Sequence, residues 1–162
     1  MSEKFKCDNC KTEVEEKAKY CPSCGGLFID AVCEIHKEKE AAGVCLVCNK
    51  ICCSKCGLFV NGTFLCNQHS DIEIFESMGR VYGSSDSLEI DFLLSVLETE
   101  ELHPFRYERK TSPISVGGTD YSLFRASGEY DGHIINEIKI LVPLNEYLKA
   151  KAVVVDYQNR DK

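Results

Sequence analysis

Several residue types are missing from whole parts of this 162-residue chain, and each absence narrows the class of protein. No arginine occurs before Arg80, and no cysteine follows Cys66. No apolar run approaches the ~20 residues that a membrane-spanning helix needs. Met1–Lys6 also lack the apolar core of a signal peptide. We therefore expect a soluble, cytoplasmic protein without a membrane partner.

Charge is distributed unevenly along the chain. Residues 1–70 carry nine lysines and nine acidic residues, for a net charge of zero, whereas residues 71–162 have a net charge of −7. Nucleic-acid binding uses basic surface to neutralise phosphates and arginine to read bases. We therefore do not expect nucleic acid to be the partner of this chain, although nucleic-acid binding by a zinc ribbon is the alternative function.

What the chain does have is a set of twelve potential metal ligands between Cys7 and His69. They form six pairs, each with two residues between its members: Cys7/Cys10, Cys21/Cys24, Cys33/His36, Cys45/Cys48, Cys53/Cys56 and Cys66/His69. A structural zinc ion takes four such ligands, so twelve ligands predict three zinc ions. Histidine forms no disulfide, and the clustering is typical of zinc modules. We expect reduced, metal-bound cysteines rather than a secreted disulfide scaffold.

Residues 1–30 contain two of these pairs, in FKCDNCK and KYCPSCGG. Proline presets φ and glycine accepts positive φ, so Pro22 and Gly25–Gly26 suit a tight turn around the second pair. Thr12–Val14 and Phe28–Ile29 are predicted to pair as strands. The segment resembles the small zinc-ribbon modules of many bacterial and archaeal proteins. Ordering costs roughly 1–2 kcal/mol per residue, whereas a structural zinc contributes on the order of 10–16 kcal/mol, so we expect this segment to be unfolded without metal.

Residues 31–70 read CEIH, CLVC, CSKC and CNQH, with gaps of eight, four and nine residues. The stretch CLVCNKICCSKC resembles the middle of B-box zinc fingers, a family in which alternate pairs share a zinc ion. The resemblance implies one site of Cys33, His36, Cys53 and Cys56, and another of Cys45, Cys48, Cys66 and His69. Spacing alone also allows sequential pairing, with Cys33, His36, Cys45 and Cys48 in one site and the remaining four ligands in the other.

Two further features lie within residues 31–70. The stretch LFVNGTFL is predicted to be a β-hairpin around Asn61–Gly62, because Asn-Gly favours turns with positive φ at both positions. Cys52 is left over once the twelve ligands are assigned, and we expect a small buried side chain. The alternatives are that Cys52 replaces a neighbouring cysteine as a metal ligand, or that its thiol serves a redox or zinc sensor.

Residues 71–78 are predicted to be an acidic linker, and residues 79–162 a separate domain. A strand is expected at Arg80–Tyr82, followed by a helix with Asp86 as its N-cap and Glu89 completing a capping box. The helix should end before His103, which precedes a proline. Its expected core face follows spacings of three and four: Leu88, Phe92, Leu93, Val96 and Leu97.

Phe105–Tyr107 and Glu137–Val142 alternate as strands, and Tyr121–Ala126 is a further candidate strand. A second helix is predicted from Glu146 to about Tyr157, with a closing strand at its end as the alternative. Its apolar side is expected to contain Leu148, Ala152 and Val155.

This order of strand, helix, strand, strand and helix predicts an α+β sandwich of ferredoxin-like type. The segments RVYGSS, LLSVLETEELHPFRYER and KILVPLNEYLKAKAVV resemble a bacterial family of signal-transducing proteins related in fold to PII regulators. His103 and His133 have no acid or nucleophile at an informative spacing, and no catalytic constellation is found. We therefore expect a non-enzymatic adaptor or regulatory protein with a protein partner that the sequence does not identify.

Overall fold

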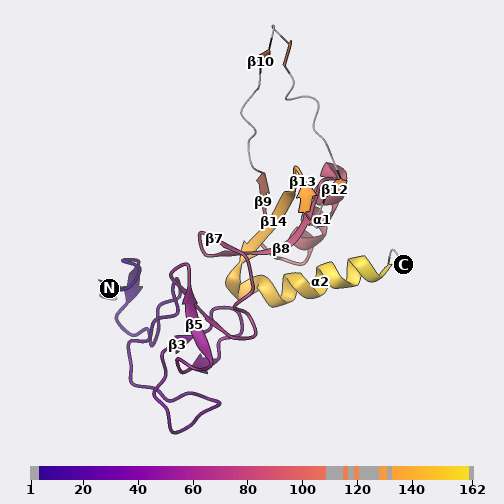
Figure 1. Cartoon of the computed structure of the whole chain (residues 1–162). Helices are drawn as coiled ribbons and strands as arrows, with labels where there is room; N and C mark the ends of the chain where they lie inside the picture. Colours follow the sequence, from indigo (N-terminus) through magenta and orange to yellow (C-terminus); the bar gives the residue numbers. More distant parts are fainter. Residues whose placement is uncertain (1–3, 109–114, 117–118, 121–127, 131–132, 161–162) are drawn as a thin grey trace. The chain divides into compact units, whose positions relative to one another are not determined.

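The structure is a computed structural model and describes residues 4–108, 115–116, 119–120, 128–130 and 133–160. The chain divides into two compact units, Met1–Gly79 and Arg80–Lys162. We call them the cysteine-rich unit, which is indigo to magenta in Figure 1, and the α/β unit, which ends in the yellow helix α2.

The cysteine-rich unit is built from short strands joined by turns. They are β1 (Lys4–Lys6), β2 (Glu13–Glu15), β3 (Gly43–Val44), β4 (Ile51–Cys52), β5 (Gly57–Val60), β6 (Thr63–Cys66) and β7 (Ile74–Phe75). β1–β2, β3–β4 and β5–β6 are antiparallel pairs. Nine of the fifteen buried apolar residues of this unit are cysteines. The other six are valine, leucine and phenylalanine, so this unit has few aliphatic or aromatic core residues.

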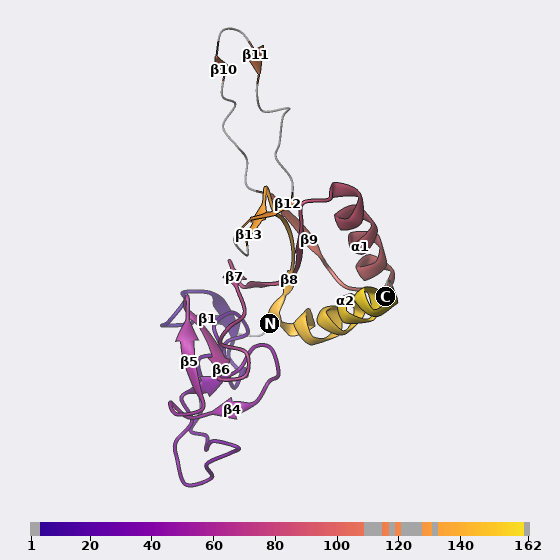
Figure 2. The same cartoon turned by 45° about the vertical axis from the view of Figure 1, so that its right-hand side comes forward.

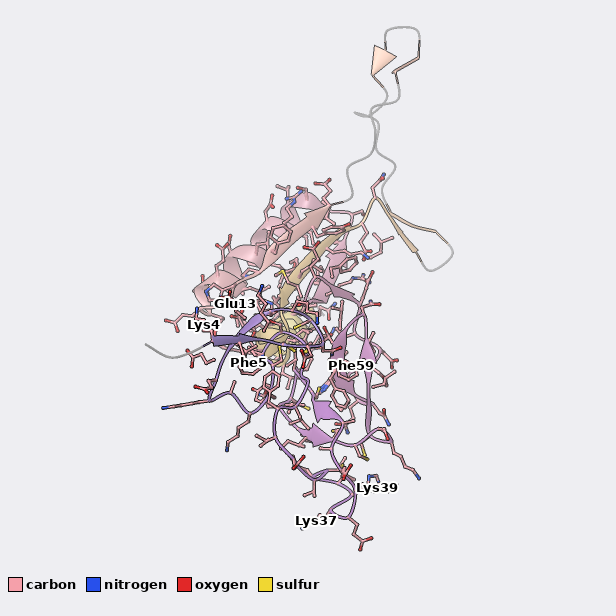
Figure 3. All side chains as sticks on the ribbon, turned by 90° about the vertical axis from the view of Figure 1, so that its left-hand side faces the viewer. Lys4, Phe5, Glu13, Lys37, Lys39 and Phe59 are labelled. Carbon is pink, nitrogen blue, oxygen red and sulfur yellow. The ribbon has the colours of Figure 1, made fainter. Side chains whose placement is uncertain are left out.

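The first hairpin pairs β2 with β1, so the predicted pairing of Thr12–Val14 with Phe28–Ile29 is wrong. Phe5, labelled in Figure 3, lies opposite Val14. Phe28 packs on Phe5 through its ring instead, with centroids 4.8 Å apart and ring planes at 77°. The sequence pattern did not reveal that the residues before the first cysteine pair form a strand.

The predicted hairpin at residues 58–65 is confirmed as β5–β6. Asn61 and Gly62 have φ values of 49° and 80°, as a turn with two left-handed residues requires. Strand β6 is buried along its whole length. On β5, Leu58 is 47% exposed and Phe59, labelled in Figure 3, is 45% exposed.

The segment predicted to be a linker, residues 71–78, contains β7 and the start of β8 (Met78–Ser84). The two strands form an antiparallel hairpin in which Phe75 lies opposite Met78. Its turn residues Glu76 and Ser77 have φ values of 45° and 70°. Neither position has the asparagine, aspartate or glycine that usually signals a turn with two left-handed residues, which explains why the hairpin was not predicted.

The α/β unit continues β8 into helices, strands and a short 3-10 turn. They are α1 (Ser87–Thr99), β9 (Phe105–Glu108), β10 (Ser115–Val116), β11 (Thr119–Asp120), β12 (Gly128–Tyr130), β13 (His133–Ile135), β14 (Ile138–Pro143), the turn η2 (Leu144–Glu146) and α2 (Tyr147–Arg160). The main sheet has the order β7-β8-β14-β9, and β14 is antiparallel to β9. β10–β11 and β12–β13 are separate antiparallel pairs. The candidate strand at residues 121–126 lies outside the described residues.

Both helices pack on one face of this sheet, as Figure 2 shows. Alternation along β14 directs Ile138, Ile140 and Val142 into the core, as predicted. The main cluster of buried core residues contains Val81, Ile90, Leu93, Leu97, Leu102, Ile138, Ile140, Val142, Ala150 and Val154. Within the described ranges, no helix is long and apolar enough to cross a membrane.

The N-terminus of α1 confirms half of the predicted capping box. Asp86 is the N-cap, and its side chain accepts hydrogen bonds from the amides of Leu88 and Glu89. The Glu89 carboxylate, however, accepts from the Tyr82 hydroxyl at 2.7 Å and from Ser84 Oγ at 2.6 Å. The second acid therefore joins the helix to β8 instead of closing the box.

The buried face of α1 agrees with the predicted one only at Leu93 and Leu97. Ile90, Leu93 and Leu97 are fully buried, whereas Leu88 is 81% and Phe92 56% exposed. At roughly 100° per residue, Leu88 and Phe92 lie on the side of the helix opposite the buried residues. Apolar residues surround more than half of this helix, so their spacing alone did not identify the core face.

The C-terminus of α1 is closed by backbone hydrogen bonds rather than by the following proline. The Leu102 amide donates to the Leu97 carbonyl at 3.2 Å, and Glu101 has a left-handed φ of 60°. This is the pattern of a Schellman cap, which usually places glycine where Glu101 stands. The helix consequently ends at Thr99, a few residues before His103.

Helix α2 confirms the predicted helix and excludes a closing strand at residues 153–155. Its predicted face is wrong, because Ala150 and Val154 are buried whereas Leu148 is 49% and Val155 42% exposed. Ala152 is also exposed. The stripe at positions 148, 152 and 155 therefore faces away from the core.

Candidate metal centres

The twelve predicted ligands come together as three tetrads in the cysteine-rich unit. Site 1 is Cys7, Cys10, Cys21 and Cys24; site 2 is Cys33, His36, Cys53 and Cys56; site 3 is Cys45, Cys48, Cys66 and His69. In each site the four ligand atoms lie within 4.8 Å of one another. Sites 2 and 3 interleave along the chain, so the sequential pairing is wrong.

Site 1 contains four sulfur ligands from two turns of the chain. Cys7 Sγ lies 3.7 Å from Cys24 Sγ, and Cys10 Sγ lies 3.5 Å from Cys21 Sγ. Cys7, Cys21 and Cys24 are buried, and Cys10 is half-buried. Each turn thus contributes two sulfurs that face the same small volume.

All four Cys-x-x-Cys turns share one backbone hydrogen bond. The amide of the residue after the second cysteine donates to the carbonyl of the first cysteine. The donors and distances are Lys11 to Cys7 at 2.8 Å, Gly25 to Cys21 at 2.9 Å, Asn49 to Cys45 at 2.7 Å and Gly57 to Cys53 at 3.1 Å. The first three donors have a left-handed φ: 61° at Lys11, 76° at Gly25 and 58° at Asn49. Gly25 confirms the predicted turn, whereas lysine gives no sequence signal for this conformation.

Site 2 combines three thiols with one histidine. Cys56 Sγ lies 3.9 Å from Cys33 Sγ and 3.9 Å from Cys53 Sγ. His36 Nδ1 lies 3.1 Å from Cys56 Sγ and 3.5 Å from Cys53 Sγ. His36 is the one exposed ligand of the site. It belongs to the loop between Cys33 and β3, where Figure 3 labels Lys37 and Lys39.

Site 3 has the same donor set. Cys48 Sγ lies 3.8 Å from Cys66 Sγ, and His69 Nδ1 lies 3.2 Å from Cys66 Sγ and 3.5 Å from Cys45 Sγ. Burial lowers the pKa of His69, and the nearby Lys50 charge lowers it further. Both effects favour the neutral imidazole, which is the form that binds a metal ion.

The distances fit a tetrahedral metal ion. Zinc–sulfur bonds of ~2.3 Å place two sulfurs of a regular tetrahedron about 3.8 Å apart. Five Sγ–Sγ pairs within the three sites are 3.5 to 3.9 Å apart, and all ligand atoms of a site lie within 4.8 Å of one another. All eleven cysteines are free thiols. Each tetrad can therefore hold one metal ion, and the donor sets are those of structural zinc.

The thiol pKa values show why a cation suits these clusters. Burial raises the pKa of Cys10, but hydrogen bonds from the Thr12 hydroxyl and amide outweigh it and lower the pKa to about 6. Burial and the neighbouring thiols of Cys21 and Cys7 raise the pKa of Cys24 to about 12. One thiol of site 1 thus has a lowered pKa and another a raised one. In sites 3 and 2, burial and the neighbouring thiols, partly through repulsion by like charge, likewise raise the pKa of Cys48 and of Cys56 to about 12. A divalent cation at the centre removes that repulsion.

Cys52 belongs to none of the three tetrads. Its side chain is 0% exposed, which confirms the predicted small buried side chain. Burial, with smaller effects of the Cys66 and Cys33 thiolates, raises its pKa to about 11. On strand β4 it lies opposite Gly43.

His103 has an acidic partner that its sequence spacing did not reveal. The Glu146 Oε2 atom accepts a hydrogen bond from the His103 backbone amide at 2.8 Å. The Oε1 atom of the same carboxylate lies 2.7 Å from His103 Nδ1. The pair joins the segment after α1 to the start of α2. The His133 side chain is outside the described residues.

The metal centres therefore rest on ligand geometry and donor chemistry. Protein-family models, curated proteins and solved structures were each compared with the chain, and nothing matched.

Proposed function

We propose that this chain is a non-catalytic, zinc-binding adaptor or regulatory protein that acts through a protein partner. One observation carries the proposal: every tetrad supplies four protein ligands. Catalytic zinc keeps a coordination position for water or substrate, whereas a closed set of four is structural. Zinc bound there would cross-link segments of chain. Thiolate ligands require a reducing compartment, so a cytoplasmic location is part of the proposal.

We assign site 1 to a ribbon-like module in residues 1–30 and sites 2 and 3 to a B-box-like module in residues 31–70. The interleaved ligand order of sites 2 and 3 supports this assignment. In both modules the zinc ions would present turns and hairpins as rigid surfaces.

We assign residues 79–162 to a ferredoxin-like signal-transducing domain. The connection of β8 through α1 to β9, with β14 between those two strands, supports this assignment. Helix α2 follows β14, as the second helix does in a βαββαβ fold.

The surface of the cysteine-rich unit favours a protein over a nucleic acid. Ile35 is 62% exposed, and Leu58 and Phe59 on β5 are 47% and 45% exposed. Exposed apolar residues are typical of protein interfaces. Residues 1–70 have no net charge and no arginine, so they lack the basic surface that phosphates attract.

A site-specific photocrosslinker in the full chain tests this proposal. Placed at Phe59 it should give a discrete protein adduct in the source cell, and the exposed position Glu16 is the matched control. A neighbouring Leu58→Asp substitution should abolish the adduct. Nuclease-sensitive adducts, or firm retention of the protein on heparin at moderate salt, would instead favour the nucleic-acid alternative.

A redox or zinc sensor based on Cys52 is the less favoured alternative. The thiolate is the form that oxidants attack, and Cys52 is fully buried with a raised pKa. Zinc release by a mild oxidant should therefore proceed at the same rate in the wild type and in Cys52→Ser. Slower release from the variant would make the sensor the better hypothesis.

A further inference from the structure

Phe64 on β6 lies where the three metal sites converge. Its side chain is 1% exposed. Three glycines leave room for it: an added Cβ would lie 2.9 Å from Phe64 Cβ at Gly25, 2.5 Å from its ring at Gly43 and 2.8 Å from its ring at Gly57. At Gly43 the Phe64 ring is the nearest neighbour of the added Cβ, whereas at Gly25 and Gly57 a backbone oxygen lies closer still, Val44 O at 2.3 Å and Leu65 O at 2.7 Å.

Each of these glycines is next to, or two residues from, a ligand of a different site. Gly25 follows Cys24 of site 1, and Gly57 follows Cys56 of site 2. Gly43 precedes Cys45 of site 3 by two residues. Phe64 itself precedes Cys66, another ligand of site 3.

Backbone hydrogen bonds reinforce this packing. The Phe64 amide donates to the Cys24 carbonyl at 2.8 Å, and the Val44 amide donates to the Gly25 carbonyl at 2.8 Å. The Leu46 amide donates to the Phe64 carbonyl at 3.3 Å. The turn that carries half of site 1 is thus bonded to the two strands that lead into site 3.

We propose that the three zinc sites bind metal as a coupled set, with Phe64 and its hydrogen bonds as the physical link. When sites 2 and 3 are filled, β3 and β6 already present the surface on which the Cys24–Gly25 turn is ordered. Part of the ordering entropy of site 1 is then already lost before its metal binds, so the affinity of site 1 rises. Coupling of binding free energies is reciprocal, so a filled site 1 raises the affinity of site 3 by the same factor. The inference requires only the metal sites and is independent of the partner proposed above.

Cobalt(II) titration of the full chain tests the coupling, because site 1 has four sulfur ligands whereas sites 2 and 3 each have three and a nitrogen. The two donor sets give distinguishable cobalt absorption bands. Disabling site 3 by His69→Ala should lower the cobalt affinity of site 1 by about 5–150-fold, the usual range of coupling between sites. Phe64→Ala, which removes no ligand, should do the same.

A glycine variant is the matched control. Gly62 has a φ of 80° and nothing within 4 Å of an added Cβ, so Gly62→Ala reproduces left-handed strain without a clash. It should leave the affinity of site 1 within about twofold of the wild type.

The reverse experiment is decisive if Phe64→Ala proves unfolded. Cys7 lies on the other turn of site 1, which makes none of the contacts with Phe64, β3 or β6 described above. Cys7→Ser should lower the cobalt affinity of the sites with three sulfur ligands. The expected factor is the one by which His69→Ala lowers the affinity of site 1. The proposal would be overturned if the sites bound cobalt independently. The cobalt affinity of site 1 would then be unchanged in His69→Ala, or that of the other sites unchanged in Cys7→Ser.

Discussion

The backbone amide of Phe64 donates a hydrogen bond to the carbonyl oxygen of Cys24, 40 residues earlier in the chain, at 2.8 Å. Cys24 is a ligand of site 1, and Phe64 lies two residues before a ligand of site 3. Strand β6 thus has β5 along one edge and the site 1 turn along the other. The segments that resemble two separate zinc modules share a backbone contact inside one compact unit.

Metal removal should affect the two units differently. With strong chelator the cysteine-rich unit should unfold, because each structural zinc contributes on the order of 10–16 kcal/mol. The α/β unit should retain its helices, because its core contains no metal ligand. Native mass spectrometry should show three zinc ions per chain before treatment.

A fragment of residues 79–162 should melt cooperatively at the same temperature with and without chelator. A melting temperature that changes with chelator would contradict this prediction.

The interleaved pairing can be tested by counting metal in double variants. Cys33 and Cys53 share site 2, so Cys33→Ser/Cys53→Ser should retain two zinc ions at saturating metal. Cys33 and Cys45 belong to different sites, so Cys33→Ser/Cys45→Ser should retain one. Sequential pairing would give the opposite counts in native mass spectrometry.

Adjacent valines on α2 test which face of the helix is buried. Val154 is 0% and Val155 42% exposed. Val154→Ala should lower the free energy of unfolding by ~2 kcal/mol, through lost burial and a residual cavity. Val155→Ala is the control and should change it by less than about 0.5 kcal/mol. Urea unfolding followed by helix circular dichroism measures both, and a larger loss from Val155→Ala would restore the face predicted from spacing.

Alkaline stability should depend on Tyr147. Burial raises the pKa of its hydroxyl above the ordinary value of 10, although the Arg80 charge acts in the opposite direction. A group with a raised folded-state pKa contributes stability that is complete below its unfolded pKa and is lost as pH rises through the folded pKa. The α/β unit should therefore lose stability above about pH 10, and Tyr147→Phe should lose less. Urea titrations at pH 8 and pH 11 give the comparison, and equal losses in both proteins would exclude this role.

The sequence was sufficient for features set by local chemistry. Ligand spacing predicted all twelve members of the three tetrads, because two residues between ligands let a single turn direct both donors at one ion. Asn61–Gly62 predicted the β5–β6 turn, and Asp86 predicted the start of α1, since each depends on the preferences of one or two residues. Helical periodicity likewise located α1 and α2.

Tertiary structure decided everything that depends on which surface is in contact with which. Leu88 and Phe92 on α1, and Leu148 on α2, fit a helical stripe as well as the buried residues do. Only the sheet selects the side that loses contact with water. The interleaving of sites 2 and 3 was implied by a family resemblance but left open by the ligand spacing, and it arises, like the place of Phe64 among three glycines, from contacts between residues far apart in the chain. Local spacing carries no information on such contacts, because the entropy and packing that select them belong to the whole folded unit.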